Sequence, residues 1–117
     1  MIGFTSLTGD YNNGGLPQAT TDPLGVYACW ADLLINTGVP QGLYWQVDGA
    51  SPNRGITFEW NTQHYNNGTD LYHFLMSFYE SLPNIVTIDF LNMTGVGFAS
   101  TVGVEGSSRS TSSRLSR

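Results

Sequence analysis

The chain has 117 residues, enough for one domain with a single hydrophobic core. Its formal net charge is −5, it contains no lysine, and only 11% of its residues are charged. Residues 1–106 hold nine carboxylates and one arginine, Arg54, for a charge of −8. Such a surface repels nucleic acid and anionic membranes, and no apolar run approaches the ~18 residues that a transmembrane helix needs. We therefore expect no nucleic-acid partner and no membrane insertion.

The N-terminal third predicts two short strands separated by a long loop. A first strand is expected around Ile2, and residues 8–23, which are rich in Gly, Asn, Thr and Pro, predict a loop. Residues 24–35 mix small and apolar side chains. This pattern predicts a strand through Trp30, followed either by a bend at Asp32 or by a short helix, because a brief apolar run fits both.

Cys29 is the only cysteine, so no disulfide can form within the chain. It lies in an apolar run and has no basic neighbour in the sequence to lower the pKa of its thiol. We therefore interpret it as a small buried apolar residue.

The clearest signal comes from the middle of the chain, where apolar and polar side chains alternate with a period of two. This alternation, rich in aromatic and β-branched residues, is typical of strands that cover a core with one face. The predicted strands are residues 42–47, 56–61, 72–79 and 86–90. The predicted turns between and after them are Asp48–Asn53, Asn66–Thr69, Leu82–Asn84 and Thr94–Gly97, and a last strand is expected from Phe98 to Val104.

Six or seven strands with regularly spaced turns and almost no helix predict an all-β fold, an antiparallel two-layer β-sandwich or jelly roll. We expect this domain to occupy residues 1–106. Residues 107–117 are a low-complexity Ser/Arg-rich segment and predict a flexible tail. The alternation places Trp30, Trp45 and Trp60 in the core.

Several aspartates lie in predicted loops and strand ends, where they could supply oxygen ligands to calcium. These are Asp10, Asp22, Asp32 and Asp48. Their spacing matches no EF-hand or calcium-binding repeat, and the usual role of Asp beside Gly is to cap a turn. We therefore expect no cofactor, with calcium as the minor alternative.

Glu59 and Glu80 are the carboxylates best suited to acid–base chemistry, but the pattern gives no reason for them to converge. A glycosidase needs two carboxylates about 5–10 Å apart across a sugar, and a small hydrolase is the least favoured hypothesis. The sequence shows no complete catalytic signature. We expect the protein not to be an enzyme and assign no catalytic residue and no metal ligand.

His64 and His73 flank the predicted turn at Asn66–Thr69. In a hairpin symmetric about Gly68–Thr69 they would face each other across two strands, where opposed histidines can hold a metal or titrate near neutral pH. Zinc requires further ligands that the sequence does not offer, and ordinary cross-strand packing is the commoner role of such a pair.

Arg54 is expected to form an ion pair with Asp48 that closes the loop between them, and the sharper alternative is a clamp for a ligand carboxylate. The candidate binding residues are therefore Asp32, Asp48, Arg54, His64 and His73.

Two sequons, at Asn67 and Asn92, are candidate glycosylation sites at predicted turns. They agree with the Ser, Thr, Asn and Gly content, which is common in extracellular and cell-surface proteins. The first residues show no leader peptide. A cytosolic protein and a mature product that has lost its leader both fit this start, and the composition favours the second.

The order of these segments resembles a known family. The residues that carry the resemblance are Trp30–Leu33, Gln41–Tyr44, Arg54–Trp60, Tyr72–Phe74, Phe78–Glu80 and Ala99–Glu105. They are similar to the extracellular β-sandwich modules of secreted fungal and bacterial surface proteins, which are adhesin-like and akin to nidogen-type domains. The resemblance spans residues 26–105 and implies a non-enzymatic module of adhesive or matrix proteins.

Two functions are therefore predicted. The first is an extracellular structural or adhesive module that acts through protein–protein contacts and self-assembles through an exposed edge strand into an oligomer or filament. The alternative is a carbohydrate-binding module that uses loop carboxylates and exposed aromatic side chains, with calcium as an optional ligand. The tyrosines considered are Tyr27, Tyr44, Tyr65 and Tyr79.

Overall fold

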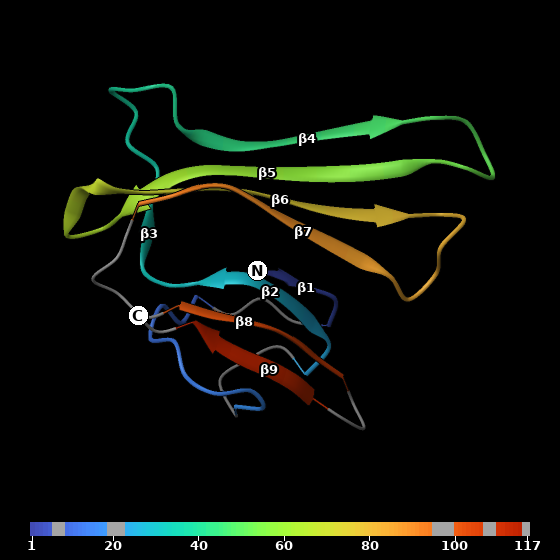
Figure 1. The fold of residues 1–117 in the computed structure, drawn as a ribbon, viewed down its shortest axis with the longest axis horizontal. Helices are drawn as coiled ribbons and strands as arrows, with labels where there is room; N and C mark the ends of the chain where they lie inside the picture. The colour runs from blue at the N-terminus through green and yellow to red at the C-terminus, as the bar shows by residue number, and fades with distance from the viewer. Residues whose placement is uncertain (6–8, 19–22, 95–99, 107–109, 116–117) are drawn as a thin grey trace. The chain divides into compact units, whose positions relative to one another are not determined.

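The computed structural model describes residues 1–5, 9–18, 23–94, 100–106 and 110–115. These residues form nine strands in two antiparallel sheets and no helix, which confirms the predicted all-β, two-sheet architecture (Figure 1). The strands are β1 (Ile2–Gly3), β2 (Gly25–Trp30), β3 (Leu33–Leu34), β4 (Gly42–Asp48), β5 (Gly55–His64), β6 (Asn67–Tyr79), β7 (Val86–Met93), β8 (Ser100–Glu105) and β9 (Ser110–Leu115). The chain divides into two compact units, residues 1–32 with 96–117 and residues 33–95.

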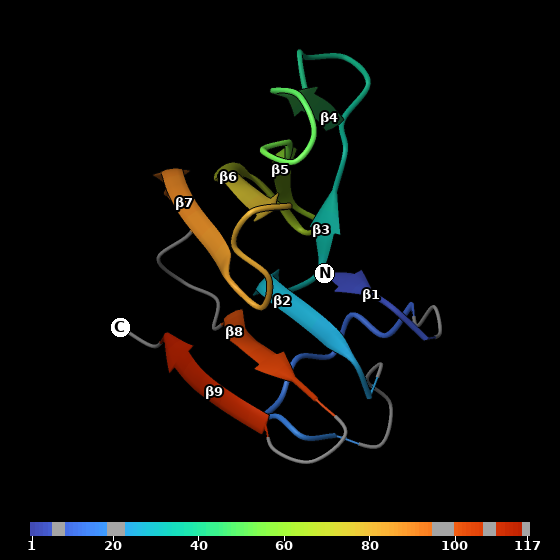
Figure 2. The ribbon, with the colours of Figure 1, turned by 90° about the vertical axis from the view of Figure 1, so that its right-hand side faces the viewer.

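The first unit contains a four-stranded antiparallel sheet in the order β1-β2-β8-β9 (Figure 2). All six residues of β2 are buried. The rings of Tyr27 and Trp30 lie 5.6 Å apart, and Leu16 and Met1 complete the apolar cluster around them. The Trp30 indole donates a hydrogen bond of 2.7 Å to the carbonyl of Asp10, so the buried polar end of the ring is satisfied. This bond ties part of the long N-terminal loop to the sheet.

Part of the segment predicted as a flexible tail forms a strand in the structure. β9 (Ser110–Leu115) pairs antiparallel with β8, in a register that runs from Ser100↔Leu115 to Glu105↔Ser110. A low-complexity Ser/Thr segment can form a strand where a neighbouring strand offers unpaired backbone groups, because the ladder itself does not depend on side-chain pattern. Residues 107–109 and 116–117 lie outside the described part of the chain, and a domain boundary at residue 106 stays a prediction.

The structure also tests the predictions for the segment after Asp32 and for the last strand before residue 106. The segment after Asp32 forms the short strand β3 rather than a helix, because Leu33 and Leu34 pair with His64 and Gln63 of β5. The last predicted strand is confirmed from Ser100 onward as β8. The predicted turn after Thr94 and the first two residues of that strand fall in 95–99, outside the described residues.

The second unit contains a five-stranded antiparallel sheet in which β5, β6 and β7 follow one another and β3 and β4 both pair with β5. β4 lies along β5 over its whole length, from Gly42↔Asn61 to Asp48↔Gly55. Because successive side chains of a strand point to opposite faces, this register gives the sheet one apolar and one polar face. The apolar face carries Leu43, Trp45, Val47, Ile56, Phe58, Trp60, Phe74, Met76, Phe78, Ile88 and Phe90, and the polar face carries Tyr44, Gln46, Thr57, Glu59, Asn61, His73, Leu75, Ser77, Thr87 and Asp89.

Aromatic contacts across β5, β6 and β7 organise the apolar face. The rings of Trp60 and Phe74 stack with centroids 5.2 Å apart, and Phe90 lies 6.3 Å beyond Phe74. Phe74 and Met76 are fully buried. Cross-strand aromatic pairs of this kind contribute about 0.5–1.5 kcal/mol each beyond the area that they bury. The predicted central meander is thus confirmed in its strands, and its apolar face is fully buried at Phe74 and Met76 of β6.

The β4–β5 hairpin closes through a loop in which Gly49 has a backbone φ of +82°. A Cβ atom at this position would lie 2.5 Å from the carbonyl oxygen of Asn53, and an L side chain is strained at such a φ. We predict that Gly49→Ala lowers the free energy of unfolding by about 1–2 kcal/mol, measured by urea denaturation. Gly55→Ala is the matched control in the same hairpin, because a Cβ there meets only ordinary contacts at 3.5 Å. Equal stability of the two variants would contradict the role of Gly49.

Cys29 is buried, as predicted, and burial raises the pKa of its thiol to about 11. We expect Ellman's reagent to label Cys29 slowly in the folded protein and rapidly in guanidinium. Because the unfolded thiol ionises near its ordinary pKa of 9.0, stability should fall as the pH rises from 9.0 towards about 11. Cys29→Ala should lack this component of alkaline destabilisation. Rapid native labelling at neutral pH would contradict the burial of the thiol.

Candidate functional site

Strand β4 is an edge of its sheet and the most exposed apolar strand in the described residues. Leu43, Trp45 and Val47 are 52%, 68% and 49% exposed, although all three lie on the apolar face. The prediction that Trp45 belongs to the core is therefore wrong, whereas Trp30 is buried and Trp60 is half-buried. Alternation shows which face a side chain occupies but not how far the core extends along that face, and an edge strand has a neighbour on one side only.

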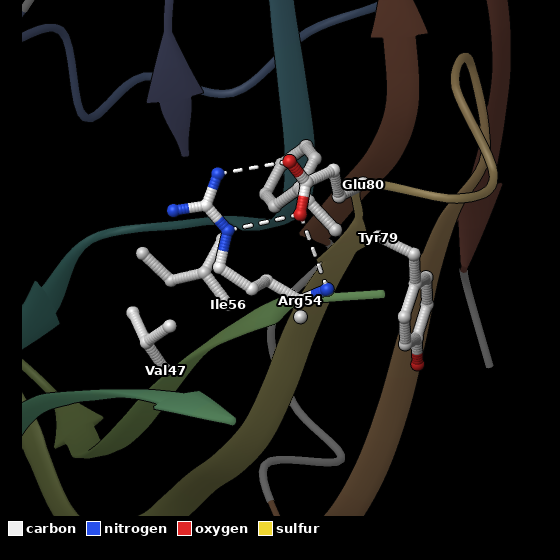
Figure 3. Close-up of a pocket in the computed structure, with 7 residues that line it drawn as sticks. Val47, Arg54, Ile56, Tyr79 and Glu80 are labelled. Atoms are coloured by element: carbon white, nitrogen blue, oxygen red, sulfur yellow. Dashed lines mark hydrogen bonds and ion pairs between the residues drawn. The ribbon is translucent and has the colours of Figure 1, made fainter. Parts of the chain in front are cut away.

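At one end of the sheet, Arg54 holds Glu80 in a two-pronged ion pair (Figure 3). The Arg54 Nε and Nη2 atoms donate to the two carboxylate oxygens at 2.9 and 2.8 Å, and the backbone N of Arg54 adds a third bond at 3.2 Å. Ser51 Oγ donates to the same carboxylate at 3.3 Å. The hydrogen bond from the Arg54 side chain is the main reason why the pKa of Glu80 is lowered to about 2.

The ion pair expected for Arg54 exists, but the predicted partner, Asp48, is wrong. Asp48 instead accepts a hydrogen bond of 2.7 Å from Gln46 Nε2. The cause is the β5–β6 register: Gly55 pairs with Tyr79, so the residues that flank this pair, Arg54 and Glu80, meet at the end of the ladder. Proximity in the sequence favoured Asp48 as the partner of Arg54, whereas the β5–β6 register is needed to identify Glu80 as that partner.

Beside this ion pair lies a pocket of about 410 Å³, lined by Val47, Arg54, Gly55, Ile56, Phe78, Tyr79 and Glu80. Figure 3 shows Val47 and Ile56 together on one side of the pair and Tyr79 on the other. Because the Arg54 guanidinium already binds Glu80 with two bonds, a ligand carboxylate would have to displace Glu80. The geometry therefore supports a structural clamp at the mouth of the β4–β5 hairpin more than a carboxylate receptor.

The polar face of the same sheet contains a second hollow, a groove of about 270 Å³. We call it the polar groove and define it by its lining residues, Tyr44, Trp45, Gln46, Asp48, Thr57, Glu59 and Leu75. Tyr44 lies directly opposite Glu59 in the β4–β5 ladder. Glu59 Oε1 contacts His73 Nε2 at 2.7 Å, and Thr57 and Ser77 share a hydrogen bond of 2.8 Å. These contacts fix the floor of the groove.

The predicted pairing of His64 with His73 is wrong. The β5–β6 turn consists of Tyr65 and Asn66, and the ladder shifts register between Gln63 and His64. His73 consequently pairs with Asn61. His64 is buried, and its Nδ1 accepts a hydrogen bond of 3.3 Å from the backbone N of Asn66. The two-residue turn, rather than the Gly68–Thr69 pair, sets the register, and no periodicity signal distinguishes the two placements.

The structure gathers no metal site from the described carboxylates, histidines and cysteine, in which no group of three or more could hold an ion. Asp10 caps a turn by accepting a hydrogen bond of 2.9 Å from the backbone N of Asn12. Asp32 lies at the end of the first unit and Asp48 in the second. Asp22, the fourth candidate, lies outside the described residues.

The remaining candidates are separated in the structure. Glu59 belongs to the polar face and Glu80 to the ion pair at the sheet end, so each carboxylate has its own partner. Asn67 opens β6 directly after the turn, and its Oδ1 accepts hydrogen bonds from the backbone N and hydroxyl of Thr69. Asn92 is exposed on β7 rather than in a turn. Glycosylation at either position stays a prediction.

Two antiparallel sheets, an exposed apolar edge and a shallow polar groove define an all-β module suited to contacts at its surface. Among the described residues there is no helix with the length and apolar character needed to cross a membrane. The chain belongs to the NIDO-related family, whose profile matches residues 1–117. This membership supports the predicted nidogen-like resemblance and suggests a non-enzymatic, extracellular structural or adhesive module. No curated protein and no solved structure matches the chain significantly.

The Arg54–Glu80 pair leads to a prediction about pH. Because the pKa of Glu80 is lowered in the folded protein, its contribution to stability is present above the ordinary value of 4.5 and is lost as the pH falls towards about 2. We expect wild type to have a higher urea midpoint than Glu80→Gln at neutral pH, and the difference to disappear near pH 2. Asp89→Asn, which removes an exposed carboxylate of β7, is the matched control. A difference between wild type and Glu80→Gln that does not change with pH would contradict this assignment.

Proposed function

We propose that this protein is an extracellular structural or adhesive module that associates with copies of itself through strand β4. The observation that carries the proposal is the exposed apolar edge formed by Leu43, Trp45 and Val47. An edge strand presents unpaired backbone N–H and C=O groups, and a second strand can add to them. Natural edge strands are commonly protected by lysine, proline or a bulge, and β4 has no lysine, no proline and a continuous register with β5.

The sequence of β4 is suited to pairing with itself. If two copies meet antiparallel about Trp45, then Leu43 lies opposite Val47 of the other copy and Tyr44 lies opposite Gln46. The only charged residue of the strand, Asp48, then lies opposite Gly42 instead of another carboxylate. Apolar and aromatic cross-strand pairs stabilise such a ladder, whereas like charges opposite each other destabilise it. A pairing of this kind is isologous and gives a dimer with twofold symmetry.

Growth beyond a dimer into a filament requires a second contact surface. β7 is the other edge of the same sheet, and it exposes Phe90 and Leu91. Contacts that alternate between β4 edges and β7 edges would extend the assembly without closing it. The fungal or bacterial surface context of the module stays a prediction.

Sedimentation velocity over a range of protein concentrations tests the proposal. We expect wild type to form dimers or larger species and Trp45→Lys to remain monomeric, because a charge in the new ladder would have to be desolvated. Tyr65→Lys is the matched control, since Tyr65 is also an exposed aromatic residue (59%) but lies in the β5–β6 turn. A wild-type protein that is monomeric at high concentration, or equal association of all three proteins, would refute the proposal. Negative-stain electron microscopy then distinguishes dimers from filaments.

A further inference from the structure

The polar face of the second sheet carries a second feature, which shares strand β4 with the proposed self-association edge. We propose that the polar groove is a binding site for neutral glycans. The groove lies on the face opposite Leu43 and Val47, and its volume of about 270 Å³ is slightly below the ~300–1,000 Å³ typical of pockets for drug-sized ligands. It therefore suits a short stretch of sugar rings, with the rest of a chain lying along the sheet.

The groove combines fixed side chains with unused hydrogen-bonding atoms. Glu59 is held through Oε1 by His73, and Gln46 is held through Nε2 by Asp48. Glu59 Oε2 and Gln46 Oε1 have no protein partner within the described part of the chain. Side chains that are already oriented lose less conformational entropy when a ligand binds. A sugar hydroxyl can donate to either of these oxygens, so the groove offers acceptors placed in advance.

Tyr44 supplies the aromatic surface. It is 49% exposed, and its ring lies over Gly42: a Cβ atom there would come within 2.7 Å of Cζ and of the hydroxyl oxygen. The absence of a side chain at Gly42 thus allows the ring to lie along the strand. An amphipathic ring can pack against the C–H face of a sugar, while its hydroxyl forms a hydrogen bond. The combination of a flat ring and neighbouring planar polar groups suits a pyranose better than a purely apolar ligand.

The negative charge of the groove and of the chain limits which glycans can bind. The groove contains two carboxylates, Asp48 and Glu59, and no lysine or arginine lines it. The chain as a whole has a net charge of −5. A sulfated or uronic-acid polymer would be repelled by this field, whereas a neutral sugar is not affected. Neutral oligosaccharides are therefore the expected ligands.

Titration of the isotope-labelled protein with cellohexaose, chitohexaose and mannohexaose, followed by amide NMR spectra, tests the inference. We expect at least one of these probes at millimolar concentration to shift amides of β4 and β5 around Tyr44 and Glu59. Tyr44→Ala and Glu59→Gln should each weaken this binding about tenfold or more. Tyr65→Ala removes an exposed tyrosine outside the groove and should leave the affinity unchanged.

The same spectra show whether each variant keeps its fold, so loss of binding is distinguished from loss of structure. If no probe shifts these amides, or if both groove variants bind as wild type does, the inference is overturned. Heparin serves as the anionic probe, and preferential binding of heparin would also overturn it. Because Glu59 lies on β5 and not on the edge strand β4, sedimentation of Glu59→Gln reports self-association independently of sugar binding.

Discussion

The register between β5 and β6 is the constraint on which the second unit depends. These two strands form the longest ladder of the sheet, and the side-chain period of a strand is two. A slip of β5 by one residue would turn Phe58 and Trp60 away from the apolar face of β6 and place Glu59 there. The same register determines the Arg54–Glu80 ion pair at one end and the buried His64 at the other. The apolar face, the Arg54–Glu80 ion pair and the placement of Glu59 beside His73 thus all depend on the β5–β6 register.

Sequence periodicity predicted this sheet well because alternation is a local property that each strand displays by itself. It could not predict the alignment of two strands, since that depends on where the turn lies. Because the turn consists of Tyr65 and Asn66, His73 lies opposite Asn61 and not opposite His64. Arg54 likewise binds Glu80, which is distant in the sequence, and not the nearby Asp48. Similarly, alternation assigned Trp45 to the apolar face correctly but could not show that its strand is an edge. The local pattern of a strand determines which face each side chain occupies. The pairing of strands that are distant in the sequence determines which side chains contact each other.

Strand β4 connects the two proposed properties because it contributes to both faces. Its odd-numbered residues, such as Val47, extend the apolar face outward, while its even-numbered residues, such as Tyr44, form one wall of the polar groove. Trp45 also lines the groove. An edge strand can combine these roles because its position leaves space on both faces of the sheet and along its free side. A central strand with the same sequence would have neighbours on both sides and no free ladder.

The scarcity of positive charge limits which contacts the module can make. Arg54 is the one arginine in residues 1–106, and its guanidinium binds Glu80. Apart from this ion pair, residues 1–106 offer carboxylates and neutral groups. Two copies of the chain, each with a net charge of −5, repel each other over distances up to the Debye length of about 8–10 Å. Pairing at the apolar part of β4 brings no charged side chains face to face, since the strand's carboxylate lies at its end. Electrostatic repulsion between copies therefore opposes non-specific association. The backbone hydrogen bonds of a β4–β4 ladder act at short range and favour association through the β4 edge.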